Sequence, residues 1–411
     1  MKQFRIQLLC TVLALAGAAL AQPLPQDEWQ PGRLVSATQL ESWTAFEVQA
    51  QSSRAFVQYG QPIIENGVEL WELSFVTTGL GGELRPVTAQ LFLPVDAPRE
   101  TAPLFVYGSG TTGIAAQCAP SRETLLPTPL GYYRELLAAY AGRGFVTVFP
   151  DYLGFDDPDR PQSYFHAQSE AQVLLDSARA VREFFDTTGR SAGLLPDTFF
   201  GGYSQGGHAA FAVADQQRDY APDVLLRGVI GFAATTDVEA LMREAAFYSP
   251  YIVLSYLDVY GPVQVDPAEI LGARWLPGLE SNAGAVCVDR AQQIYPMDGS
   301  GMYTAEFHAA LLAGNTASAA PGFATALAAN NTGLTGHGVP ALVIQGGRDV
   351  IVSDGVQERF VTELCETGSP VRYVNYPSAR HRDTRPAGFE ESLLWMRSLL
   401  EPGSVPPSDC P

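Results

Sequence analysis

The chain has 411 residues, of which 46% are hydrophobic and 17% are charged, and its 44 acidic and 25 basic residues give a net charge of −19. This negative charge excludes nucleic acids and anionic membrane surfaces as favoured partners, because both would be repelled. The length suits either two domains or one large α/β domain that carries an insertion.

The first 21 residues have the pattern of a secretory signal peptide. A basic start with Lys2 and Arg5 leads into an apolar run at 6–20, and Ala19 and Ala21 form a cleavage site of the A-x-A kind. The run is shorter than the about 20 residues that cross a bilayer, which disfavours a membrane anchor. We expect a secreted protein, extracellular or periplasmic, with no integral membrane segment and a mature net charge of −19 − 2 = −21.

The mature chain alternates short apolar strands with amphipathic helices. After an N-terminal arm at 22–61, the pattern predicts strands at 70–77, 88–93 and 104–107, a helix at 132–142, a strand at 145–149, a helix at 170–185, a strand at 198–202, a helix at 205–213 and a strand at 228–233. Later come a strand at 341–345, a helix at 355–364, a strand at 371–376 and a helix at 389–400. This order predicts an α/β fold with a mostly parallel sheet and helices on both faces.

The alternation stops between residues 237 and 336, where an aromatic-rich section at 247–260 and an Ala/Gly-rich section at 311–329 occur. Because structureless loops of this length are rare in compact domains, we predict a mainly helical insertion that serves as a lid or acyl-binding cap. A packing subdomain without substrate contact is the alternative. The predicted organisation is a signal peptide at 1–21, the arm and first part of the core at 22–236, the cap at 237–336 and the rest of the core at 337–411.

Four cysteines remain once Cys10 leaves with the leader, since 5 − 1 = 4. They are Cys118, Cys287, Cys365 and Cys410. An even number in an exported chain predicts two disulfides, with three pairings open. None has C-x-x-C spacing, so we expect no metal bound through thiolates.

Ser204 lies in the segment GGYSQGG, in which Gly202 and Gly206 give the G-x-S-x-G form of a nucleophile elbow. Such an elbow joins a strand to a helix and needs almost no side-chain atoms two positions before and after the serine. The pattern alone leaves a turn serine as the alternative. Its place after the predicted strand at 198–202 favours a nucleophile.

A serine nucleophile needs a base to accept its proton and an acid to orient that base. His381 and Asp349 each follow a late predicted strand, and the order Ser204, Asp349, His381 is that of an α/β-hydrolase triad. Asp354, interpreted as a cap of the next helix, and Asp237 are the competing acids. Structural or surface roles are expected for the other four histidines, His166, His208, His308 and His337.

Backbone N–H groups must also stabilise the oxyanion that forms in acyl transfer. The N–H of Gln205, directly after the nucleophile, is one candidate, and Thr111 in the glycine-rich loop at 108–113 after the third predicted strand is the other.

These features together resemble the secretory lipase family, related to the Candida-type lipase A enzymes, within the α/β-hydrolase superfamily. The resemblance rests on VYGSGTTG at 106–113, QCAPS at 117–121, PDYLG at 150–154, SEA at 169–171, the elbow, and the loops of Asp349 and His381. It implies hydrolysis of carboxylic esters without a cofactor or metal, a triad at Ser204, Asp349 and His381, and the disulfides Cys118–Cys287 and Cys365–Cys410. Many relatives have His where this chain has Ser109.

We therefore expect an exported, monomeric serine hydrolase that cleaves a small-molecule or lipid ester through an acyl-enzyme on Ser204, as a lipase or carboxylesterase. A serine peptidase of α/β-hydrolase type is the enzymatic alternative. A non-catalytic binding protein of this fold is the other, and it would normally lack a triad residue.

Overall fold

The core is a nine-stranded sheet. A computed structural model describes residues 25–95, 102–125, 131–190 and 193–411, and the predicted signal peptide lies outside these residues. The strands are β1 (Leu34–Trp43), β2 (Val68–Thr78), β3 (Leu84–Pro94), β4 (Ala102–Gly108), β5 (Val146–Pro150), β6 (Leu194–Tyr203), β7 (Leu225–Phe232), β8 (Ala341–Gly346) and β9 (Val371–Tyr376). They lie in the order β1-β2-β3-β5-β4-β6-β7-β8-β9, antiparallel from β1 to β5 and parallel from β5 to β9.

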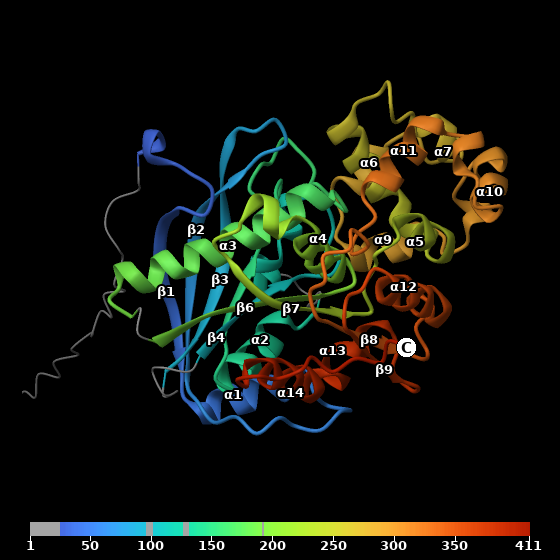
Figure 1. The fold of residues 1–411 in the computed structure, drawn as a ribbon. Coiled ribbons are helices and arrows are strands. Elements are labelled where there is room, and N and C mark those ends of the chain that lie inside the picture. The colour runs from blue at the N-terminus through green and yellow to red at the C-terminus, as the bar shows by residue number, and fades with distance from the viewer. Residues whose placement is uncertain (1–24, 96–101, 126–130, 191–192) are drawn as a thin grey trace, which may run out of the picture.

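Helices cover both faces of this sheet (Figure 1). One face packs against α3 (Ala167–Thr187), α4 (Gln205–Tyr220) and α12 (Asp354–Glu366), and the other against α1 (Ala45–Ser52), α2 (Tyr133–Gly142) and α14 (Phe389–Leu400). Every residue of β4, β5 and β8 is buried, as expected for parallel strands between two helical layers. The predicted fold class is confirmed.

The predicted arm at 22–61 is wrong in one respect, because its residues from Leu34 include the edge strand β1. Two irregularities in the β1–β2 pairing, at Leu34/Ser36 and Gln39/Glu41, break the two-residue alternation that identifies a strand. Counting β1, the glycine-rich loop at 108–113 follows the fourth strand of the chain and not the third.

Residues 237–336, here named the cap segment, are mainly helical. They form α5 (Val238–Glu244), α6 (Ser249–Tyr260), α7 (Pro267–Ile270), α8 (Leu279–Ala283), α9 (Val288–Ile294), α10 (Ala305–Leu312) and α11 (Pro321–Ala329). These helices gather beyond α4 and α12 (Figure 1) around their own apolar cluster, which includes Tyr256, Phe307 and Phe323. Within the described part of the chain, no helix has the length and apolarity to cross a membrane.

Two disulfides fasten segments that are distant in the sequence, Cys118–Cys287 and Cys365–Cys410, as the resemblance implied. The first joins the region after β4 to the start of α9, where Val288 N–H also donates to the carbonyl of Thr112 (2.9 Å).

The second disulfide ties the C-terminal tail to α12. The tail lies along the outer edge of β9: Asp409 N–H donates to the carbonyl of Val371 (2.7 Å), and the Asp409 carboxylate accepts from Tyr373 N–H (2.8 Å).

Candidate active site

Ser204 occupies a strained turn between β6 and α4. Its backbone angles are φ 54° and ψ −112°, and a positive φ is rare for a residue other than glycine. Its N–H donates to the carbonyl of Phe232 at the end of β7 (2.9 Å), which fixes the turn against the sheet. The side chain thus stands at the carboxyl edge of the parallel strands, where sites form in open α/β sheets.

The glycines around Ser204 are required by close backbone contacts. A Cβ on Gly206 would lie 1.9 Å from the carbonyl oxygen of Gly108, and one on Gly202 would lie 2.4 Å from the backbone of Gly206. Both distances are far below van der Waals contact. The two glycines therefore allow α4 to begin directly against the end of β4 and the glycine-rich loop.

Asp349 and His381 form a buried pair at the same edge of the sheet. Asp349 follows β8 and His381 follows β9, and Oδ2 of Asp349 lies 2.6 Å from Nδ1 of His381. The other carboxylate oxygen accepts from the N–H groups of Ile351 (2.8 Å) and Val352 (3.0 Å). A carboxylate at Nδ1 holds the hydrogen on that nitrogen and leaves Nε2 as the acceptor. Among the described residues, Nε2 has no hydrogen-bond partner.

The two competing acids are engaged elsewhere. Asp354 accepts from the Tyr373 hydroxyl (2.8 Å) and from Asn375 Nδ2 (2.7 Å). It is not the cap of α12, as the sequence suggested, because Ser353 caps that helix and Asp354 is its first residue. Asp237 caps α5 through Ala240 N–H.

The segments that carry Ser204 and His381 meet through the side chain of Tyr203. The ring of Tyr203, next to the nucleophile, lies 4.8 Å from the His381 ring. The Ser204 hydroxyl lies 3.5 Å from the hydroxyl of Thr235, and no hydrogen bond to His381 is present among the described residues. Such bonds are often long before a substrate binds. Thr235 was not among the predicted site residues, since its only signal in the sequence is its place just after β7.

The two proposed oxyanion donors belong to the two segments that meet at the contact between Gly108 and Gly206. Gly110 N–H already donates to the Tyr133 hydroxyl (2.8 Å), whereas the N–H groups of Thr111 and Gln205 bond to no other group in the described part of the chain. The Thr111 hydroxyl pairs with that of Tyr164 (2.7 Å). This contact holds its loop in place while its amide stays available.

A buried polar cluster supports the first turn of α4. Oε1 of Glu170 accepts from Gln205 Nε2 (2.7 Å) and Phe165 N–H (3.0 Å), and Oε2 lies 2.6 Å from Nδ1 of His208. Nε2 of His208 must donate, because its partner is the carbonyl of Asn330 (2.7 Å), so a second hydrogen lies between Nδ1 and Glu170. The cluster joins α3, α4 and the cap segment. The sequence showed none of these contacts.

The remaining histidines have structural roles. Nδ1 of His166 caps α3 by accepting from Ser169 N–H, and burial lowers the pKa of His166 to about 4, so it is neutral near pH 7. Nδ1 of His337 accepts from Val339 N–H (2.9 Å). His308 packs in the cap segment against Tyr303.

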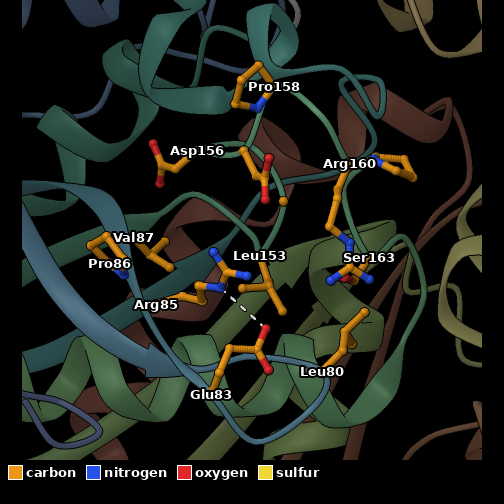
Figure 2. A pocket seen from close by; sticks show the side chains of 13 residues that line it. Leu80, Glu83, Arg85, Pro86, Val87, Leu153, Asp156, Pro158, Arg160 and Ser163 are labelled. Atoms are coloured by element: carbon orange, nitrogen blue, oxygen red, sulfur yellow. Dashed lines mark hydrogen bonds and ion pairs between the residues drawn. The ribbon is translucent and has the colours of Figure 1, made fainter.

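The side chains in Figure 2 line a cavity, and none of the three triad candidates is among them. Its volume is about 300 Å³. It lies between the β2–β3 turn and the loop after β5. Both of its arginines are already paired, Arg85 with Glu83 (3.3 Å, Figure 2) and Arg160 with Asp258 (2.8 Å). Its carboxylate Asp156 accepts from the N–H (3.0 Å) and hydroxyl (3.2 Å) of Thr88. The cavity therefore offers few uncommitted groups to a substrate.

Comparisons with known proteins agree with this architecture. Residues 128–253 match the model of the secretory lipase family. A "probable inactive lipase" of Mycobacterium tuberculosis is 26% identical over 177 residues, which cover 41% of this chain and 37% of that protein. The match thus spans little more than a third of that relative's length.

Two solved structures share the fold. The rice cell wall degrading esterase LipA from Xanthomonas oryzae has a TM-score of 0.72 and 20% identity, covering 90% of this chain and 98% of that chain. Candida antarctica lipase A in its closed state has a TM-score of 0.67 and 17% identity, covering 95% of this chain and 88% of that chain. The expected resemblance is confirmed: residues 128–253 match the secretory lipase family, and the chain as a whole has the α/β-hydrolase fold of this esterase and this lipase.

Proposed function

We propose that this protein is an exported serine hydrolase that cleaves carboxylic esters through an acyl-enzyme on Ser204. The observation that carries the proposal is the Asp349–His381 pair, whose unbonded Nε2 lies at the same sheet edge as a serine in a strained turn. This combination is what nucleophilic acyl transfer requires, because the base is oriented and its accepting nitrogen is uncommitted.

In the proposed mechanism, His381 Nε2 takes the hydroxyl proton as Ser204 Oγ attacks the ester carbonyl. The N–H groups of Thr111 and Gln205 stabilise the tetrahedral oxyanion, and Asp349 stabilises the imidazolium. His381 then donates the proton to the leaving alcohol. In the second half, it activates a water molecule that releases the acid and restores Ser204.

The cap segment is proposed to cover this site and to select the acyl chain. Ser204 and His381 are only 3% and 6% exposed. Glu244 of α5 accepts from the N–H (2.8 Å) and hydroxyl (2.5 Å) of Ser353, which ties the cap segment to the loop that carries Asp349. This attachment supports a lid function, because a movement of α5 would shift the loop that positions Asp349.

Export is supported by the two disulfides, which form and persist in oxidising compartments, and by the match to secretory lipases. Fractionation of cells that express the full chain tests it. Protein that stays in the cytoplasm with an intact leader would contradict the proposal.

The experiment that tests the activity compares the wild-type protein with Ser204→Ala on esters of short to long acyl chains and on a matched amide. Ser177→Ala, which alters a buried serine of α3, is the control. We expect ester hydrolysis to fall by about 10⁴-fold or more in Ser204→Ala only. A serine-directed fluorophosphonate should label every protein except Ser204→Ala.

The second candidate function is a non-catalytic role, because the mycobacterial relative is named a probable inactive lipase. No hydrolysis and no labelling of the wild-type protein would favour that role. Cleavage of the amide alone would favour a peptidase.

A further inference from the structure

A second cavity, of about 230 Å³, lies between the segment after α1, the start of α2 and α13 (Thr384–Ala387). Three arginines line it, Arg54, Arg382 and Arg385, together with apolar side chains that include Val57 and Leu136. The cavity, here named the arginine pocket, is thus cationic in a chain whose net charge is −19.

The arginines of this pocket form no ion pair with an acidic side chain among the described residues, and the Glu123 carboxylate acts on Arg385 only at longer range. Within the described part of the chain, no ion pair within 4.0 Å involves any of the three. The pocket's own carboxylate, Asp383, is paired with Arg380 (3.0 Å). In the cavity of Figure 2, by contrast, both arginines have carboxylate partners.

Arg385 is the least solvated of the three, at 5% exposed. Its Nη1 donates to the carbonyl of Gly131 (2.6 Å), and its guanidinium lies over the rings of Tyr203 (4.4 Å) and Tyr133 (5.1 Å). The nearby buried carboxylate of Glu123 accepts instead from the N–H groups at the start of α2. Burying a charged side chain costs free energy unless an opposite charge lies close to it. A carbonyl oxygen and aromatic rings carry only partial negative charge, so they offset that cost incompletely.

The lining also indicates what kind of anion fits. Apolar walls beside three cations suit a group that is charged at one end and hydrocarbon at the other. Planar guanidinium groups bind carboxylates in bidentate geometry, which adds specificity to the attraction. The volume lies below the range of pockets for drug-sized ligands, about 300–1,000 Å³. These features favour a short monocarboxylic acid.

We propose that the arginine pocket binds the carboxylate of a short aliphatic acid, the acid half of the esters that this protein cleaves. The link to the reaction rests on the proposed function, whereas the binding itself does not. The pocket borders the triad candidates: Arg382 follows His381, and the Tyr203 ring that Arg385 covers also contacts the His381 ring. A bound acid would therefore place a carboxylate in direct contact with these arginines, next to the proposed catalytic base.

The test is calorimetric titration of hexanoate into Ser204→Ala protein, which keeps the measurement independent of turnover. Arg54→Gln/Arg382→Gln removes the two exposed arginines and leaves the buried one. Arg290→Gln/Arg359→Gln removes two other exposed arginines without ion pairs and matches the change in net charge. We expect the Kd for hexanoate to rise at least tenfold in the pocket variant and to stay within twofold in the control.

Two neutral or chain-free probes complete the test. Hexanol should bind at least tenfold more weakly than hexanoate, because it lacks the charge, and so should inorganic phosphate, because it lacks the chain. Equal hexanoate affinity in the pocket variant would overturn the proposal, since the acid would then bind elsewhere, for example at the triad. Hexanol or phosphate binding as tightly as hexanoate would overturn the assigned ligand class. If the wild-type protein hydrolysed no ester, the proposed function would be refuted, but the test of hexanoate binding would still stand.

Discussion

Gly206→Ala tests whether the contact between Gly108 and Gly206 aligns the oxyanion donors. An alanine Cβ would lie 1.9 Å from the Gly108 carbonyl oxygen, and ordinary contact begins at 3.4 Å, so the two backbones must separate by 3.4 − 1.9 = 1.5 Å to restore ordinary contact. This contact joins the loop of Thr111 to the turn of Gln205. A misplacement of about 1 Å can cost about 10²-fold, and loss of one oxyanion donor about 10²–10³-fold.

We therefore expect kcat for a short-chain p-nitrophenyl ester to fall about 10²–10³-fold in Gly206→Ala, with a smaller change in KM. Gly355→Ala is the matched control, because a Cβ there meets no atom within 4 Å. Circular dichroism would establish that both variants are folded. A folded Gly206→Ala protein whose kcat stays within threefold of the wild-type value would refute this reasoning.

Three further predictions concern buried carboxylates. Asp349→Asn should lower kcat about 10³–10⁴-fold in steady-state assays, and Asp354→Asn less than tenfold. A larger loss in Asp354→Asn than in Asp349→Asn would make Asp354 the acid of the triad. Glu170→Ala should lower the free energy of unfolding by roughly 3 kcal/mol or more, because three buried donors or acceptors lose their partner. Glu170→Gln, which can both accept and donate, should retain most of that stability in urea denaturation. Burial raises the pKa of Asp151 to about 7, against 3.8 for the exposed group. The folded chain therefore holds more protons than the unfolded chain between about pH 4 and 7, so its stability falls by a few kcal/mol as the pH rises through that window. Asp151→Asn should lack this decline in urea titrations at several pH values, and parallel curves for the two proteins would contradict the assignment.

Much of the parallel core was predictable because its strands are short apolar runs with clear boundaries. The segments 371–376 and 389–400 coincide with β9 and α14, and Ser204, Asp349 and His381 all follow predicted strands. Chain order and strand ends suffice to gather such residues, since the carboxyl ends of parallel strands share one edge.

Other features depend on contacts that no local pattern encodes. β1 was missed because its irregular pairing hides the alternation. Ser353, not Asp354, caps α12 because the helix begins at Asp354, one residue before the predicted start. Glu170 and Thr235 acquire their neighbours only when α3 and β7 reach the nucleophile. Arg385 gave no signal in the sequence, because the groups around it come from the start of α2 and the end of β6, which are distant in the chain.

The C-terminal tail has a consequence for association between molecules. β9 is the last strand of the sheet, and its free side would present unpaired N–H and carbonyl groups to another chain. Asp409 forms hydrogen bonds with two of these groups, the Val371 carbonyl and the Tyr373 N–H. The disulfide from Cys410 to α12 holds the tail in this position. The second disulfide thus opposes aggregation by keeping this edge covered. In a reducing solution the tail would be released, and the exposed edge of β9 would be open to pairing with strands of other molecules.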